Sequence, residues 1–280
     1  MIGQKNNIKL INSQIKSKSF PRFSIIVGAT GSGKKTLTNY IIDKMKIQLV
    51  YNSGISVSQV RDTITYMHKV VDPTVVTFYD ADIMSVQAKN ALLKVAEETP
   101  NNVYIIMTVT DLNNVLDTIK SRAYIYSMQP YTADEIDTYY HDYGVDRSTD
   151  VRNIVRNLCE TPGEIELLCK NGASELFDYA ELAVDNIATV NGANAFKMAR
   201  KIAFKDDEEG FDMQLFLKAF RHICMYRMGN ACIDGVHEDI VKYGAGLDVI
   251  NNIIGQLHIT GISKSALFDI FILDIRKAWM

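Results

Sequence analysis

The run with the clearest chemical meaning is Gly28-Ala29-Thr30-Gly31-Ser32-Gly33-Lys34, which follows the apolar segment 23–27. Apolar residues then recur at helical spacing, so the run lies between an expected strand and an expected helix. Glycines in such a loop let backbone N–H groups face phosphate oxygens, the helix N-terminus adds positive potential, and Lys34 supplies a charge. This P-loop predicts a nucleotide site formed by Gly28, Gly31, Gly33, Lys34, Lys35 and Thr36.

The same loop lacks the usual hydroxyl for magnesium. A P-loop lysine is normally followed by Ser or Thr, but Lys35 stands at that position and Thr36 comes one residue late. A shift of one residue on a helix rotates a side chain by about 100°, so we expect Thr36 to point away from the metal. Lys35 would also repel a cation. The sequence thus predicts ATP or ADP as a ligand of Gly33 and Lys34, and it leaves magnesium open.

A second run that could do chemistry ends the apolar segment 74–79 with Asp80, Ala81 and Asp82. A nucleotide hydrolase needs one carboxylate for magnesium and a neighbouring group that positions water. Two interpretations stay open at this point. Either Asp80 acts in such a site, or Asp80 and Asp82 are solvated residues that cap the end of a strand.

Strands and helices alternate in the first half of the chain. We expect strands at 23–27, 74–79, 103–109 and 124–128, and helices at 86–98, 113–121, 211–228 and 266–279. Ser85 and Thr132 are expected to cap helices. Because the strands are too apolar to have one wet face, the pattern favours an α/β domain with a parallel sheet at 1–129. A small helical unit is expected at 130–180, and an all-α unit at 181–280.

Composition limits the remaining possibilities. The 280 residues are 47% hydrophobic and carry a formal net charge of −3, and we expect a cytoplasmic protein without a membrane segment or secretory signal. The scattered cysteines and histidines predict no metal centre. Residues 1–70 are rich in Lys and Arg, and their only acids are Asp43 and Asp62. This basic lobe either attracts a polyanion or is a solvated surface.

Four runs together resemble the clamp-loader AAA+ subunits of bacterial DNA polymerase III, which are the gamma/tau and delta-prime subunits. They are Asp80-Ala81-Asp82, Asn90-Ala91-Leu92-Leu93-Lys94, the apolar segment ending in Thr110, and Ser121-Arg122. Their order along residues 24–123 is that of the family's Walker B segment, the helix after it, the sensor 1 strand and the Ser-Arg-Cys motif. The resemblance implies a AAA+ P-loop domain, a helical lid and a C-terminal collar domain that joins subunits.

The resemblance also implies roles for single residues. The family's metal-binding aspartate falls on Tyr79 and its glutamate on Asp80, while Thr110 falls at sensor 1. In the family, the residue matched by Arg122 reaches the γ-phosphate of a neighbour's ATP; Ala123 replaces the cysteine of the motif. A structural alternative is that Arg122 pairs with a nearby acid such as Asp117.

A delta-prime-like subunit is the expectation that follows from this resemblance. The lid run Thr161-Pro162-Gly163-Glu164 has no arginine where active members carry sensor 2. We therefore expect little or no ATPase activity from the isolated chain, and a role in a hetero-pentamer that loads a sliding clamp on primer-template DNA. One alternative is an active gamma-type ATPase whose metal site uses Thr36, Asp80 and Thr110. Another is a DNA-binding adaptor that uses the basic lobe alone.

Overall fold

The structure, a computed structural model, describes residues 2–143, 155–156, 158–171, 173–188, 213–257 and 263–280. The chain forms two compact units, of which the first comprises Met1–Glu135 with Thr161–Gly163 and the second comprises Ile136–Glu160 with Glu164–Met280. The first unit contains α1 (Lys5–Lys16), β1 (Phe23–Val27), α2 (Lys34–Met45), β2 (Leu49–Ser53), α3 (Val57–Met67), β3 (Thr74–Phe78), η1 (Ala81–Ile83), α4 (Val86–Glu97), β4 (Val103–Val109), η2 (Leu112–Asn114), α5 (Asp117–Lys120) and β5 (Tyr124–Ser127). The remaining helices are α6 (Ala133–Tyr143), α8 (Pro162–Asn171), α9 (Ala173–Asn186), α11 (Met213–Asp234), α12 (His237–Gln256) and α13 (Lys264–Trp279).

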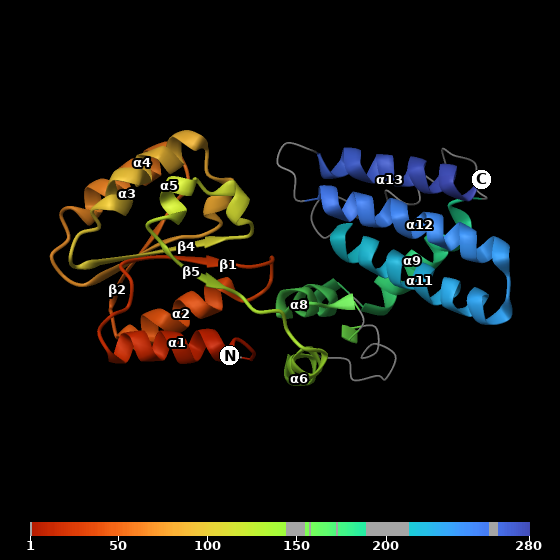
Figure 1. The fold of residues 1–280 in the computed structure, drawn as a ribbon, viewed down its shortest axis with the longest axis horizontal. Helices are drawn as coiled ribbons and strands as arrows, with labels where there is room; N and C mark the ends of the chain where they lie inside the picture. Colours follow the sequence, from red (N-terminus) through yellow and green to blue (C-terminus); the bar gives the residue numbers. More distant parts are fainter. Residues whose placement is uncertain (1, 144–154, 157, 172, 189–212, 258–262) are drawn as a thin grey trace. The chain divides into compact units, whose positions relative to one another are not determined.

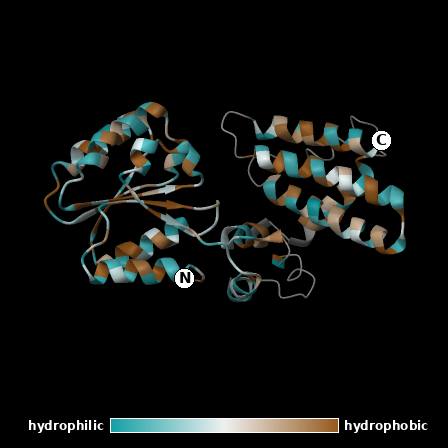
Figure 2. Cartoon of the chain, viewed as in Figure 1, coloured by the Kyte–Doolittle hydropathy of each residue, from teal (hydrophilic) through white to brown (hydrophobic). Residues whose placement is uncertain are grey.

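A five-stranded parallel sheet is the centre of the first unit. Its strand order is β2-β3-β4-β1-β5, so β1 lies between β4 and β5. Helices α1 and α2 cover one face and α3 and α4 cover the other (Figure 1). Alternate residues of β1 serve the two cores: Ile25 packs with α3 and α4, and Ile26 packs with α1 and α2. The central strands are hydrophobic along their length (Figure 2), as a sheet buried on both faces requires.

The helix starts agree with the capping residues expected from the sequence. Ser85 accepts a hydrogen bond from the N–H of Ala88 at the start of α4. Thr132 and Glu135 satisfy each other's backbone N–H groups before α6, which is a capping box. The helix expected at 113–121 is wrong: a short 3-10 turn, η2, is followed by extended backbone at Val115, and only then by α5. Val115 is buried in the sheet core, and a continuous helix would not place it there.

The second unit is helical, as expected. Helix α11 packs against α9 and α12, and α12 packs against α13. Aromatic side chains fill its core, with Phe216 and Phe220 of α11 against Phe268 and Phe271 of α13. The expected boundary at 129 falls near the end of the first unit at Glu135, whereas the one at 180 falls inside α9. The separation of lid from collar stays a prediction. Within the described residues, no helix is both long enough and apolar enough to cross a membrane.

Candidate functional site

The P-loop connects the carboxyl end of β1 to the first turn of α2. Gly31 and Gly33 have positive φ angles of 77° and 86°, a left-handed conformation that glycine adopts without strain. No side chain caps the start of α2, so its first N–H groups are available to an anion. Ser32 Oγ is buried and has no hydrogen-bond partner in the part of the chain that the structure describes. These features fit a nucleotide phosphate.

Lys34 forms hydrogen bonds to the backbone of its own P-loop. Its ammonium donates hydrogen bonds to Gly28 O at 2.7 Å and Ala29 O at 3.0 Å. Burial lowers the pKa of Lys34 from its usual value, and the carboxylates of Asp80 and Asp82 oppose that shift. An arriving phosphate would have to draw this ammonium away from the two carbonyl groups.

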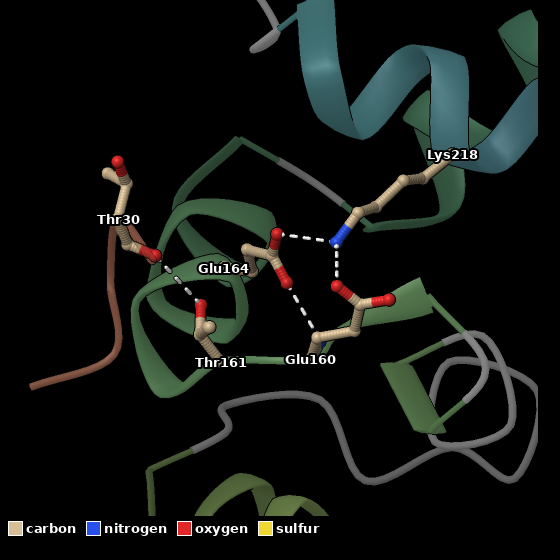
Figure 3. A network of polar contacts seen from close by, with 5 residues as sticks. All are labelled: Thr30, Glu160, Thr161, Glu164 and Lys218. Atoms are coloured by element: carbon tan, nitrogen blue, oxygen red, sulfur yellow. Dashed lines mark hydrogen bonds and ion pairs between the residues drawn. The ribbon is translucent and has the colours of Figure 1, made fainter. Parts of the chain in front are cut away.

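Residues from outside the loop bind its remaining carbonyl groups. Tyr131 Oη donates to Ser32 O at 2.9 Å, Thr161 Oγ1 to Thr30 O at 3.4 Å, and Gly163 N to Gly31 O at 3.0 Å. We call Thr161–Gly163 the strap; Figure 3 shows Thr161 directed at Thr30. The strap lies so close to the loop that a Cβ on Gly163 would stand 2.4 Å from Gly31 Cα. The strap and Tyr131 therefore fix three carbonyl groups of the P-loop that Lys34 does not bind.

The close approach at the strap gives a first prediction. In Gly163→Ala the new methyl group meets backbone rather than a flexible side chain, so the strap must move away from Gly31. We expect a loss of about 1–3 kcal/mol in unfolding free energy, measured by urea denaturation, and faster hydrogen exchange in the P-loop. The control is Gly229→Ala in α11, where a Cβ meets nothing within 4 Å; it should be neutral or stabilise by up to about 1 kcal/mol. Equal behaviour of the two variants would show that the strap is loose.

The two positions that depart from a magnesium site lie together. Lys35 Nζ is 3.9 Å from Asp80 Oδ2 and 5.1 Å from the centre of the Tyr79 ring. Asp80 has a positive φ of 52°, and its N–H donates to Thr108 Oγ1 at 3.0 Å. The ammonium of Lys35 thus faces the carboxylate of Asp80. Thr36 is exposed on the first turn of α2.

Asp82 has a structural contact that the sequence did not suggest. Its side chain is buried, and Oδ2 accepts the backbone N–H of Thr110 at 2.9 Å and that of Asp111 at 3.4 Å. Lys89 reaches the same turn and donates to Asp82 O at 2.8 Å. The interpretation of Asp82 as a solvated cap is therefore wrong, because it ties the end of β3 to the end of β4. Thr110 is held close to the P-loop edge by this bond.

Arg122 lies two residues before the amino end of β5. Because β5 runs parallel to β1, this is the end of the sheet opposite the P-loop. Arg122 Nη2 donates to Glu97 Oε1 at 2.8 Å, and its Nη1 donates to Thr118 O at 2.7 Å. The structural alternative had named a nearby acid such as Asp117; the acid that pairs with Arg122 is Glu97, while Asp117 pairs with Lys120, which lowers the pKa of Asp117. A hollow of about 500 Å³ opens beside Arg122 and Glu97, with Arg22 in its lining.

Glu164 belongs to an ion cluster in the second unit, together with Lys218 and Glu160. Lys218 on α11 is 3.0 Å from Glu160 Oε2 and 2.7 Å from Glu164 Oε1 (Figure 3). The other oxygen of Glu164 accepts the N–H of Glu160 at 2.7 Å. Burial alone would lower the pKa of Lys218, but the charges and hydrogen bonds of Glu164 and Glu160 outweigh it and raise that pKa. Glu164 is therefore held by Lys218.

The structure brings the sequence-derived P-loop residues, Asp80 and Thr110 to one edge of the sheet, and it separates Arg122 from them. Sequence reasoning missed four participants: Arg22, Glu97, Tyr131 and the backbone of Gly163. Only Gly163 carried a local signal, because glycine after proline marks a turn. The contacts of the other three join segments far apart in the chain.

The chain is similar in sequence and in fold to proteins of DNA replication and recombination. Residues 52–132 match the model of the family described as DNA polymerase III, delta subunit. Among curated proteins, none matches the sequence of the chain. The structure is similar to a DNA polymerase III gamma subunit-related protein of Thermotoga maritima, with a TM-score of 0.53 and 13% identity over 96% of this chain and 99% of that one.

A second similar structure is the RuvB Holliday junction branch migration motor of Thermotoga maritima, with a TM-score of 0.52 and 17% identity over 81% of this chain and 76% of that one. At such identities these likenesses show the fold. They confirm the expected fold of a parallel sheet with flanking helices and a helical C-terminal part. The family match therefore lies within the sheet unit, at residues 52–132, and the two structural likenesses extend the shared fold over most of the chain.

Proposed function

We propose that the chain acts in DNA replication as a delta-prime-like clamp-loader subunit that donates Arg122 to the ATP site of a neighbouring subunit. The observation that carries the proposal is the position of Arg122, at the end of the sheet opposite its own P-loop, with 36% of its side chain exposed. A guanidinium at that end serves a phosphate held by a second chain better than one held by its own. Its planar donors suit the oxygens of a transferring phosphoryl group.

The chain's own nucleotide site is proposed to bind ATP or ADP and to hydrolyse little. The P-loop geometry supports phosphate binding, as the orphaned Ser32 hydroxyl and the uncapped α2 terminus indicate. Magnesium chemistry is poorly supported, because Lys35 faces Asp80 and Tyr79 occupies the position of the metal carboxylate. A cation would meet an ammonium at the place where it needs oxygen ligands.

The proposed assembly is a hetero-pentamer of clamp-loader subunits that places a sliding clamp on primer-template DNA. This part of the proposal rests on the family match and on the similarity to a gamma subunit-related protein. The helical second unit would supply the collar contacts between subunits. The basic lobe of residues 1–70 would then lie on a complex that handles DNA.

Nucleotide binding by the isolated chain tests the inert-site part of the proposal. We expect ATP and ADP to bind with nearly the same dissociation constant with and without magnesium, and no steady-state turnover. In the double variant Lys35→Thr with Tyr79→Asp, which returns an oxygen ligand and a carboxylate, magnesium should tighten ATP binding about tenfold, or roughly 1.4 kcal/mol. Isothermal calorimetry measures both constants. Thr36→Val is the matched control and should change neither, because Thr36 points into solvent.

Magnesium-dependent turnover by the unmodified isolated chain would favour the gamma-type alternative with its metal site at Thr36, Asp80 and Thr110. Salt-sensitive DNA binding without partner subunits would favour the adaptor alternative. The adaptor alternative does not explain an exposed Arg122 at the end of the sheet opposite the P-loop. The gamma-type alternative shares this arginine, and the contact of Lys35 with Asp80 at the metal site is what disfavours it.

A further inference from the structure

Arg22 and Arg122 both line the same hollow. Arg22 stands one residue before β1, where Ile105 N donates to its backbone carbonyl at 2.7 Å, so its Cα position is set by the sheet. Its Nη1 donates to Pro100 O at 3.3 Å, and its guanidinium lies 5.5 Å from the centre of the Tyr104 ring. These contacts hold the group at the wall of the hollow.

The charges around the hollow do not balance. Arg122 is paired with Glu97, the only carboxylate in the lining. No carboxylate in the described ranges forms an ion pair with Arg22, whose contacts are a carbonyl oxygen and an aromatic face. The hydroxyl groups of Thr99 and Ser121 donate to carbonyls of their own helices. The hollow therefore has one positive charge in excess, and Arg22 supplies it.

A half-buried guanidinium without an acid partner is costly unless an anion arrives. From this we infer that Arg22 is a second trans-acting residue, which binds the phosphates of the nucleotide that the neighbouring subunit holds beside Arg122. The inference rests on the proposed function, since it places the same nucleotide in the hollow. A neutral Arg122–Glu97 pair attracts a triphosphate weakly. Arg22 provides the net positive charge that brings the phosphates to the pair, where they compete with Glu97 for the guanidinium of Arg122.

The two arginines have different expected kinetic roles. Arg122 is bound to Glu97 and Thr118 O in the isolated chain and must leave Glu97 to meet charge that develops on the γ-phosphate, so it acts on kcat. Arg22 is restrained by Pro100 and Tyr104, so it acts equally on bound ATP and on the transition state. Uniform binding of that kind lowers KM and leaves kcat unchanged.

The test uses the reconstituted partner complex with primer-template DNA. Arg22→Gln should raise the KM for ATP about tenfold, as the loss of one charge-assisted hydrogen bond implies, with kcat nearly unchanged. Arg22→Lys keeps the charge but loses the planar fork and should fall between Gln and wild type. Lys264→Gln removes a charge from the start of α13 and serves as the matched control.

The melting temperature of the isolated chain distinguishes a loss of charge at position 22 from a loss of folding stability. Arg22→Gln loses the charged contact with the Tyr104 ring, whereas Arg22→Lys can still donate to Pro100 O and lie over that ring. The melting temperatures therefore show how much of any change in KM comes from a loss of structure. Equal KM values for the Lys and Gln variants would overturn the inference and leave Arg22 as a brace for the α4–β4 turn. If Arg22→Gln leaves KM unchanged while Arg122→Ala removes turnover, the inference fails and the proposed function stands. If neither change affects turnover, the proposed function itself fails.

Discussion

Replacing Arg122 by alanine should reduce ATP turnover of the reconstituted complex by about 10³-fold or more, the usual contribution of an arginine supplied in trans. The reason is electrostatic: the developing charge on the neighbour's γ-phosphate loses a planar group with several donors. The hydrogen bonds of Arg122 to Glu97 and Thr118 are made at the surface, so their loss should not unfold the chain. Turnover is measured by phosphate release with primer-template DNA present.

The control for that experiment is Lys120→Met at the end of α5, two residues before Arg122. Lys120 pairs with the exposed Asp117 and does not line the hollow, so turnover should stay at the wild-type level. Size-exclusion chromatography must show intact assembly for both variants. Unchanged turnover in Arg122→Ala would mean that Arg122 only braces Glu97 at the end of α4, and the adaptor alternative would return.

The largest effect on stability is expected from Lys218→Met. Lys218 is buried, with 6% of its side chain exposed, and Glu164 is 14% exposed. Removing the ammonium leaves the Glu164 carboxylate in a mostly buried place without the charge of Lys218. We therefore expect a loss of about 3 kcal/mol in unfolding free energy. Glu160 adds little because most of its side chain is in water. Urea denaturation followed by far-UV circular dichroism reports the change.

A compensating substitution sharpens this prediction. Glu164→Gln keeps an oxygen for the N–H of Glu160, so the double variant Lys218→Met with Glu164→Gln should recover most of the lost stability. A loss below about 1 kcal/mol in Lys218→Met alone would place the cluster among surface ion pairs. The exposed pair at Lys120 and Asp117 offers the comparison, since breaking it should barely move the transition.

Much of the sheet unit followed from sequence because its strands are continuous apolar runs. The strand expected at 103–109 and the cap at Ser85 match β4 and the start of α4. Strand β2 was not expected, because it lies at the sheet edge and all of its residues are exposed or half-buried. The interruption after η2 also escaped sequence reasoning. Asp111 there accepts the N–H of Asn113 and starts a separate turn, a local bond that competes with a longer helix.

The P-loop could be predicted from the sequence, whereas the contacts of Arg122 could not. Phosphate loops are encoded by consecutive residues, and glycine spacing alone indicates their conformation. The partner of Arg122 is Glu97, which lies 25 residues earlier in the chain, so neither helical spacing nor neighbourhood could select it over Asp117. Burial of Asp82 depends likewise on β4 lying beside β3, which periodicity does not specify.

The strap affects the order in which parts of the chain fold during synthesis. Thr161 and Thr30 are 131 residues apart, yet they share a hydrogen bond at the P-loop. Closing so long a loop is entropically demanding, although the cost rises only about 0.6 kcal/mol for each doubling of length. During synthesis the sheet strands are complete before residue 161 emerges, so early intermediates carry a P-loop without its strap. The nucleotide site, whose first residues are made early, is thus among the last parts of its unit to become rigid.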